Sequence, residues 1–345
     1  VDVTVGRQIV AWGEGDALSV LDVVNPRDNR EPGLADLDDL RLAVLASRVS
    51  WFTGAHRFEL MGIHEAYFGE FAPPLADFSP FRALVTDDPT AAALLGSKRV
   101  RFAHAPERWS LDGQMALARW VYKGPGLDLG LYAASVLDRT GVVVLPALSP
   151  ALLTADTLTL TLDHQRYTLV GTSGATAVGA WLLKWELAGE LDKAFNAGDP
   201  AAGPIPELRV DRGTTLQAMA SVGYTGIADL QIFVEVQKGF LLDGPDDVLL
   251  PVEAPIAAVR ATYSLLRERL QLAAAATAIG WTAERGWLVR GQAQYQIGDG
   301  FSVSAGYISY QPGRSATDFG PFYGFEEHDR LFTQVRWDFL VPVLR

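Results

Sequence analysis

The ten residues Ala228-Asp229-Leu230-Gln231-Ile232-Phe233-Val234-Glu235-Val236-Gln237 decide the fold class of this chain. One parity of this stretch is apolar, and the other parity carries Asp, Gln, Phe, Glu and Gln. Successive side chains of a β-strand point to opposite faces, so the stretch predicts a strand with one apolar face and one mostly polar face. Its length is also close to what a tilted strand needs to cross a bilayer.

The same alternation recurs along the chain. From Trp287 to Ile297 an apolar parity opposes Leu288, Arg290, Gln292, Gln294 and Gln296, and the last strand repeats the pattern up to Phe339. We therefore predict an all-β, transmembrane antiparallel barrel of about 14 strands, each roughly 9 to 13 residues long. The predicted spans are 2–12, 41–52, 57–67, 112–122, 127–138, 164–173, 175–188, 213–224, 227–238, 256–266, 269–281, 286–297, 301–311 and 328–340.

Connection lengths favour a membrane barrel over a soluble sandwich, which alternates in the same way. Short turns are predicted at 53–56, 123–126, 173–174, 225–226, 267–268 and 298–300. Long segments fall between them at 13–40, 68–111, 139–163, 189–212, 239–255 and 312–327. The connection at 284–286 is an exception, because it is short although the alternation predicts a long one there. Short periplasmic turns and long outer loops are typical of bacterial outer-membrane barrels. We expect one domain, 1–345, with both chain ends on the periplasmic side.

Composition narrows the function classes. The chain has 345 residues, 49% of them hydrophobic, and a net charge of −12, which argues against binding a nucleic-acid backbone. Cysteine is absent, which excludes disulfides and thiolate metal sites. No apolar run approaches the length of a membrane-spanning helix, and no basic and apolar leader opens the sequence, so we expect the chain to begin after any signal peptide.

Aromatic residues gather near the predicted strand ends, as expected for girdles at the two membrane interfaces. Core packing of these rings is the alternative. The residues are Trp12, Trp51, Tyr67, Trp109, Trp120, Tyr122, Trp281, Trp287, Tyr310 and Trp337.

The N-terminal region carries two motifs. They are Gly6-Arg7-Gln8-Ile9-Val10-Ala11-Trp12-Gly13-Glu14 and Asp22-Val23-Val24-Asn25-Pro26-Arg27-Asp28. These resemble the GRQ-x-V-x-WGE and NP-x-D signatures of an uncharacterised family of proteobacterial outer-membrane barrels, a domain of unknown function. The resemblance implies association with RND-type exporters and periplasmic lipid carriers, and therefore movement of hydrophobic molecules or lipids. It also implies strand sequence ahead of Gly6, so a barrel of 16 strands is the alternative to 14.

Arg7 conflicts with the alternation of its own strand. Strict parity places it on the lipid face, where an arginine at mid-depth costs about 2 to 4 kcal/mol. We predict that a bulge at Gly6 turns Arg7 inward, to pair with Glu14 or Asp28 from a folded-in first loop. A salt bridge that only fixes this loop is favoured over ligand binding.

The inner parity of the later strands collects charged residues. The lumen-facing candidates are Arg260, Arg290, Arg330, Arg336, Lys184, Glu186, Asp229, Glu235 and Asp338. Opposed basic and acidic walls can orient a permeating solute, and the same residues can also satisfy one another inside a closed lumen. Both readings stay open.

Catalysis and metal binding find no support in the sequence. None of the five histidines has a convincing serine partner, and no G-x-S-x-G motif is present. The acidic loop clusters do not match calcium-loop spacing. We predict no enzyme, no catalytic residue, no metal and no cofactor.

Three functions remain. The leading one is an outer-membrane conduit for hydrophobic molecules or lipids, supplied by a periplasmic lipid carrier or an RND-type exporter. The second is a passive diffusion porin for small polar solutes. The third is a structural barrel that scaffolds another outer-membrane or electron-transfer component. Outer-membrane lipid is an expected partner, nucleic acid is not, and oligomeric state stays open.

Overall fold

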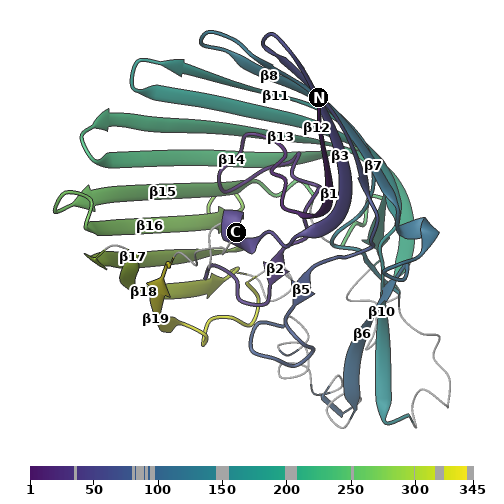
Figure 1. Ribbon diagram of the computed structural model, residues 1–345. Coiled ribbons are helices and arrows are strands. Elements are labelled where there is room, and N and C mark those ends of the chain that lie inside the picture. The colour runs from purple at the N-terminus through teal and green to yellow at the C-terminus, as the bar shows by residue number, and fades with distance from the viewer. Residues whose placement is uncertain are drawn as a thin grey trace.

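The computed structural model describes residues 1–34, 37–79, 98–144, 155–198, 208–249, 252–298, 300–314 and 322–339, with positions 82, 89, 92 and 93. Its main element is one 14-stranded sheet that curls around an interior (Figure 1). In order along the sheet the strands are β1 (Asp2–Gln8), β3 (Val44–Thr53), β4 (His56–Ile63), β7 (Met115–Lys123), β8 (Asp128–Leu137), β11 (Arg166–Val178), β12 (Trp181–Ala197), β13 (Arg209–Ile227), β14 (Leu230–Asp243), β15 (Ile256–Leu265), β16 (Leu270–Ile279), β17 (Gly286–Gly298), β18 (Phe301–Pro312) and β19 (Arg330–Trp337).

Every neighbouring pair in this sheet is antiparallel. The prediction of an all-β antiparallel barrel of about 14 strands is confirmed. Within the described residues, no ladder joins β1 to β19, so these two strands form the edges of the sheet.

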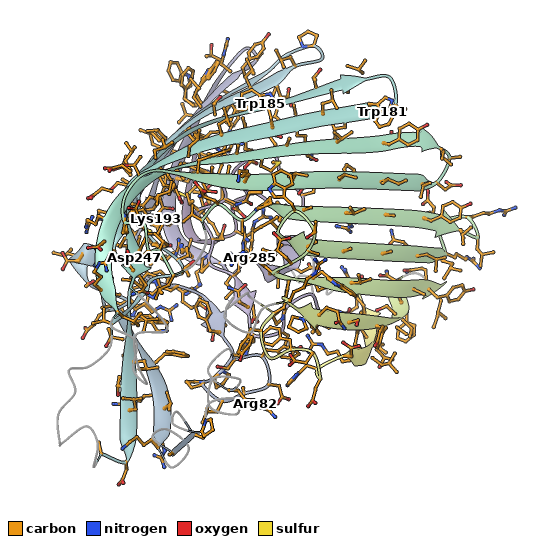
Figure 2. All side chains as sticks on the ribbon, turned by 180° about the vertical axis from the view of Figure 1, so that it is seen from behind. Arg82, Trp181, Trp185, Lys193, Asp247 and Arg285 are labelled. Carbon is orange, nitrogen blue, oxygen red and sulfur yellow. The ribbon has the colours of Figure 1, made fainter. Side chains whose placement is uncertain are left out.

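The outer face of the sheet is an apolar band. On β12, Trp181, Leu183, Trp185 and Leu187 are between 37% and 50% exposed, whereas Glu186 is fully buried. Figure 2 shows Trp181 near the hairpin end of this strand and Trp185 farther along it. So continuous an apolar exterior belongs in hydrocarbon. Separately, no helix in the described part of the chain is long and apolar enough to cross a membrane.

Two predicted turns are wrong. Ser173-Gly174 lies inside β11, whose hairpin turn is at 179–180, and Thr225-Gly226 lies inside β13, whose turn is at 228–229. The indole of Trp185 covers Gly174, where an added Cβ would stand 2.5 Å from Trp185 Nε1. This glycine makes room for an aromatic ring instead of making a turn.

The predicted first strand ends early, because β1 stops at Gln8 and the chain then enters the interior. The segments 68–111 and 139–163, predicted as connections only, contribute strands to a separate sheet in the order β6 (Arg99–Ala105), β10 (Thr157–Asp163) and β9 (Val142–Val144). β6 and β10 are parallel and project away from the barrel (Figure 1). The short elements β2 (Asp28–Asn29), β5 (Glu70–Phe71), α1 (Leu37–Leu40) and η1 (Leu111–Gly113) lie in the connections.

Two apolar clusters lie in the interior. The larger packs residues 10–24 of the N-terminal segment against inward side chains of β3, β4, β7, β8, β11, β12 and β13. The smaller consists of Ile279, Ile308, Tyr310, Phe322 and Phe325, at the long-loop ends of β16 and β18 and in the connection before β19. The interior therefore has two differently filled halves.

Candidate functional site: two halves of the barrel interior

Residues 10–27, here called the plug segment, fill the half of the interior that β3 to β13 enclose. Val10, Trp12, Leu21 and Val24 are at most 4% exposed. The Trp12 ring lies 5.5 Å from the ring of Tyr132 on β8. Trp12 is therefore a core residue and not part of an interfacial girdle, and Tyr310, which is also fully buried, is a second correction to that prediction.

Two wall carboxylates hold the plug segment. Glu186 of β12 accepts hydrogen bonds from the backbone N–H groups of residues 14, 15, 20 and 21 and from the Ser19 hydroxyl, at 2.5 to 3.2 Å. Glu235 of β14 accepts from the N–H groups of residues 16, 17 and 18, at 2.7 to 2.9 Å. Successive N–H groups aimed at one point make an anion-binding nest. We call this arrangement the glutamate clasp.

Gly13 is a necessary part of the clasp. Its φ of +90° suits glycine, and an added Cβ would stand 2.4 Å from Glu186 Oε1. Beside it, Lys184 pairs with Asp16 at 2.7 Å, which brings a predicted lumen-facing lysine onto the plug segment.

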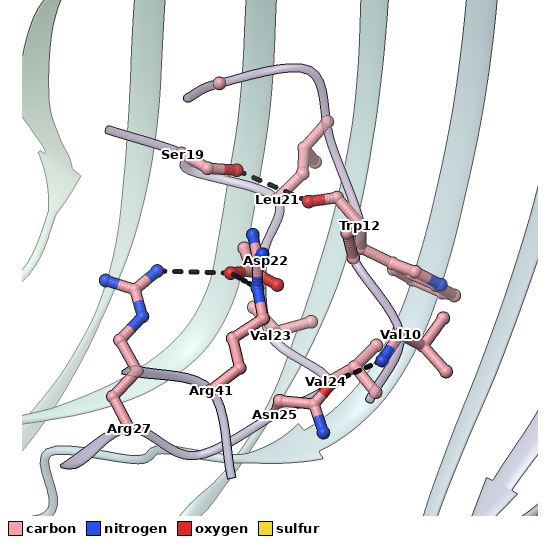
Figure 3. Close-up of polar contacts among 12 residues, drawn as sticks. Val10, Trp12, Ser19, Leu21, Asp22, Val23, Val24, Asn25, Arg27 and Arg41 are labelled. Carbon is pink, nitrogen blue, oxygen red and sulfur yellow. Dashed lines mark hydrogen bonds and ion pairs between the residues drawn. The ribbon is translucent and has the colours of Figure 1, made fainter. Parts of the chain in front are cut away.

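The second motif closes the plug segment on itself (Figure 3). Asn25 Oδ1 accepts from the N–H of Val10 at 2.7 Å. The Asn25 amide donates to the carbonyls of Gln8 and Leu42. Asp22 accepts from Arg41 at 2.9 Å and from Arg27 at 3.3 Å. The buried Pro26 carbonyl accepts from the N–H of Leu42, and Asp28 binds Arg30. The two motifs therefore pin the start and end of one interior loop.

Arg7 departs from its prediction. The β1–β3 ladder runs through Gly6 without a register shift, so there is no bulge, although Gly6 has a φ of +135°. Arg7 lies opposite Leu45 and pairs with Glu65 at 3.1 Å, not with Glu14 or Asp28. Arg7 does not turn inward. It lies at the long-loop end of β1, where its side chain is outside the middle of the membrane.

The other half of the interior is a polar wall on β15 to β19, here called the polar half-lumen. Consecutive cross-strand partners form an arginine row, which is Arg260, Ala275, Arg290, Ile308 and Arg330. Closer to the hairpin ends lies an amide row, which is Ser264, Gln271, Gln294, Ser304 and Gln334. Neighbouring strands are about 4.8 Å apart, so Arg260 and Arg290 lie about 10 Å apart along this row.

A cavity of about 520 Å³ lies against both rows. Arg260, Arg290 and Arg336 line it together with four glutamines and two serines, and Asp39 is the single acidic residue among its described lining. A second cavity of about 240 Å³ shares Gln271 and Gln294 with the first and reaches Glu268 and Arg269 in the β15–β16 turn. The polar space therefore continues to the hairpin end of the barrel.

An aromatic layer covers the long-loop end of the polar half-lumen. Phe78 packs against Tyr310 and Phe325 with ring centroids 5.5 and 5.2 Å apart. The guanidinium of Arg330 stacks on Phe78 at 4.5 Å and pairs with Glu31 at 3.3 Å. Arg330 therefore belongs to this layer more than to the cavity.

Comparison with known proteins gives the family. The family model described as "Protein of unknown function (DUF1302)" matches residues 1–340. The chain belongs to the DUF1302 family. No curated protein matches it.

Among solved structures, this DUF1302 barrel is similar to a loop-deletion mutant of OmpT, an outer-membrane protein of Vibrio cholerae, with 12% identity, 86% of this chain and 90% of that chain covered, and a TM-score of 0.41. It is also similar to the copper transporter OprC, with 9% identity, 88% and 49% covered, and a TM-score of 0.43. For the Ralstonia pickettii toluene transporter TbuX the values are 11% identity, 79% and 77% covered, and a TM-score of 0.33.

Three predicted lumen residues of this DUF1302 barrel remain to be placed, namely Arg336, Asp229 and Asp338. Arg336 lies on the inner parity of β19 and lines the larger cavity. Asp229 is wrong as a lumen residue, because it is an exposed turn residue with a φ of +62°. Asp338 lies one residue beyond β19, where it pairs with Arg336 at 3.0 Å.

Above the plugged half lies a histidine pair. His104 Nδ1 lies 2.9 Å from His164 Nε2, and His164 Nδ1 lies 2.7 Å from the carbonyl of Asp138. The Phe68 ring stacks on His164 with 3.5 Å between centroids. Burial lowers the pKa of His164 to about 4 and also lowers the pKa of His104. Both rings are therefore neutral near pH 7.

Sequence reasoning missed one contact. His64 was assigned no serine partner, but its Nε2 lies 2.8 Å from Ser47 Oγ. The two-residue turn Gly54-Ala55 fixes the β3–β4 register, which sets Ser47 opposite Gly62 and one pleat from His64. That register could have been read from the hairpin. Within the described residues, no group of three or more His, Asp or Glu side chains is placed to hold a metal ion.

Proposed function

We propose that this chain provides a pathway for small polar solutes across the bacterial outer membrane, along the polar half-lumen. The observation that carries the proposal is the pair of cavities that share Gln271 and Gln294 and run from the arginine row to the hairpin end. Amide, hydroxyl and guanidinium groups replace water around a hydrated solute, as pore linings do. The plug segment fills the other half and leaves this side as the route.

The arginine row gives the route a preference for anions. The described charged lining of the larger cavity is Arg260, Arg290 and Arg336, together with Asp39. Positive side chains in a narrow, partly desolvated space attract anions and repel cations. The aromatic layer around Phe78 and Phe325 covers the long-loop end of this route.

A conduit for hydrophobic molecules or lipids, which the family resemblance implied, stays a prediction. The described lining of the larger cavity has Leu34, Phe332 and alanines as its apolar members, and Arg, Gln and Ser among its polar ones. This composition favours polar solutes. The supply of cargo by a periplasmic lipid carrier or an RND-type exporter, and the scaffold role, are likewise untested proposals.

Solute flux into vesicles tests the proposal. The purified protein would be reconstituted in liposomes, and swelling would be measured with small sugars and organic anions. We expect Gln294→Trp, which fills the space shared by the two cavities, to slow swelling several-fold. Ala293→Trp is the matched control, because Ala293 is exposed on the outer face of the same strand. Wild-type protein that admits none of these solutes would contradict the pathway.

The orientation is a separate proposal. We place the short hairpin turns and both chain ends in the periplasm, because outer-membrane barrels have short periplasmic turns and longer outer loops. An epitope inserted at Gly179-Ala180 should be shielded from antibody on intact cells and exposed after permeabilisation. Labelling of intact cells would reverse this orientation.

A further inference from the structure

Three polar side chains meet on the outer face of the barrel sheet. Ser47 lies on β3, His64 directly follows β4, and Gln114 directly precedes β7. His64 Nε2 lies 2.8 Å from Ser47 Oγ, and His64 Nδ1 lies 3.0 Å from Gln114 Oε1. A nucleophile, a base and a group that orients the base are therefore connected in one chain of hydrogen bonds.

A further contact fixes the direction of these hydrogen bonds. Gln114 Nε2 donates to the backbone carbonyl of His64 at 3.1 Å, so the amide oxygen of Gln114 must face the imidazole. An amide oxygen only accepts, and His64 therefore carries its proton on Nδ1. The lone pair on Nε2 then faces the hydroxyl of Ser47, which is the arrangement that general-base catalysis requires.

The site faces hydrocarbon, not the lumen. Ser47 has the parity of Val49 and Trp51, which are 43% and 55% exposed, whereas Ala46 is fully buried inside. Across the ladder its partners are Val5, which is 69% exposed, and Gly62. An added Cβ at Gly62 would stand 3.4 Å from His64 Cε1, so position 62 lies directly beside the imidazole.

Cationic groups border the site on the side of the long loops. Arg7 lies one pleat beyond Val5 on the same face, and both Arg7 and Arg108 bind the single carboxylate of Glu65, at 3.1 and 2.7 Å. Arg166 donates to the carbonyl of Gln114 at 2.6 Å. A lipid in this leaflet would have a phosphate at the level of the arginines and its acyl esters deeper, near Ser47.

We propose that Ser47, His64 and Gln114 form a hydrolytic site for the acyl esters of phospholipids in the leaflet at the long-loop ends. His64 Nε2 takes the hydroxyl proton while Ser47 Oγ bonds to the ester carbonyl carbon. The resulting oxyanion collapses, the C–O bond to the lysolipid breaks, and the leaving oxygen receives the proton from His64. Water then attacks the acyl-serine with His64 as base, which releases a fatty acid and restores Ser47.

The roles of the residues differ in this scheme. Ser47 and His64 are catalytic residues, and Gln114 is a positioning residue that holds the His64 tautomer. Arg7, one pleat from Val5 on β1 and held by Glu65, is the cation at the level where the lipid phosphate would lie. The activity is independent of solute passage through the polar half-lumen, because the two sites lie on opposite faces of the sheet.

Fatty-acid release from phosphatidylethanolamine in mixed detergent micelles tests the proposal, together with labelling by a fluorophosphonate probe. We expect Ser47→Ala and His64→Ala to lower the rate at least about 100-fold and Ser47→Ala to abolish labelling. Thr172→Ala is the control, because Thr172 carries a hydroxyl on the outer face of β11, between the exposed Leu131 and Leu187 and outside the proposed site. It should keep the wild-type rate.

Gln114 has a distinct readout. Gln114→Ala should lower the rate about 10-fold and change its pH profile, because the neutral tautomer of His64 is no longer fixed, and Gln114→Glu should restore most of the rate. Each variant must keep heat-modifiable gel mobility, which shows a folded barrel. Wild-type protein that releases no more fatty acid than Ser47→Ala, with both folded, would overturn the proposal and leave these residues as a link between β3, β4 and β7.

Discussion

The two halves of the barrel interior line one continuous sheet yet are filled in opposite ways. On the β12–β14 side, Glu186 and Glu235 are at most 2% exposed and bind the backbone of the plug segment. On the β15–β19 side, arginines and glutamines surround an open cavity. A wall carboxylate can satisfy several backbone N–H groups at once, so acidic walls can hold a loop inside the barrel. Guanidinium groups only donate and offer no comparable nest for backbone N–H groups, and of the first long loop only Leu34 and Asp39 are among the described residues that line the cavity.

The largest effect is expected from breaking the glutamate clasp. The double substitution Glu186→Gln and Glu235→Gln places amide donors against the N–H groups of the plug segment. At about 2 kcal/mol for each buried site, the free energy of unfolding should fall by about 4 kcal/mol. Urea titration would measure this fall, and vesicle swelling should rise several-fold as the plugged half opens.

Glu107→Gln is the control for the clasp, because Glu107 is an exposed residue of the connection before β7 and lines neither cavity. It should change neither stability nor flux. Unchanged flux in the double variant, despite lower stability, would mean that the plug segment stays inside without its carboxylates.

Acid should loosen the β6–β10 sheet above the plugged half. The pKa of His164 is about 4 in the folded protein and about 6.5 in an unfolded chain, so the unfolded chain binds the extra proton first. The stabilising contribution is complete above about pH 6.5 and is lost as the pH falls towards 4, by up to about 3 kcal/mol. A charged His164 would also carry a proton on Nε2, and two N–H donors would then face each other, because His104 Nδ1 already donates to that nitrogen.

Hydrogen exchange measures this acid effect. Between pH 7 and 4.5, protection of β6 and β10, corrected for the intrinsic rate, should fall, while β17 should keep its protection. His164→Phe retains an aromatic partner for Phe68 and should reduce the pH dependence, to which His104 also contributes. Equal loss of protection in β17 would contradict a local effect.

Glycine positions separate a requirement for space from a requirement for backbone conformation. Gly13→Ala violates both requirements, because φ is +90° and the new Cβ would stand 2.4 Å from Glu186 Oε1. Gly54→Ala in the β3–β4 turn violates only the conformational requirement, since φ is +56° and no atom lies within 4 Å of the new Cβ. We expect losses of about 2 to 3 kcal/mol for Gly13→Ala and about 1 kcal/mol for Gly54→Ala in urea titrations. Equal losses would show that the clasp tolerates displacement.

Alternation was sufficient to predict the strands, because one face must be apolar over the full membrane thickness. It could not place every turn, since Gly174 has turn chemistry but lies under Trp185. The interior was harder to predict. Trp12 reads as an interfacial aromatic until the chain is seen to leave β1 at Gln8. Glu186 and Glu235 were predicted to face the lumen, and in the structure they bind backbone N–H groups, which are the same in every sequence and leave no pattern to detect.

The smallest effect on stability is expected from substitutions at Arg290, which should instead change the ion preference of the route. Its guanidinium stacks on Phe332 at 5.3 Å and lies at the centre of the arginine row, against the cavity. Arg290→Glu should cost less than about 1 kcal/mol of stability, because a side chain beside a water-filled cavity remains solvated. The same change alters the local charge by two units, so the reversal potential in a salt gradient across a planar bilayer should move from anion preference towards cation preference.

Arg290→Lys is the matched variant. It keeps the charge but loses the planar stack on Phe332, so it should retain anion preference with a modest change in conductance. If both variants keep the wild-type reversal potential, ions do not pass the arginine row. The polar half-lumen would then be a closed, water-filled pocket, and the contrast between the two halves would be one of packing alone.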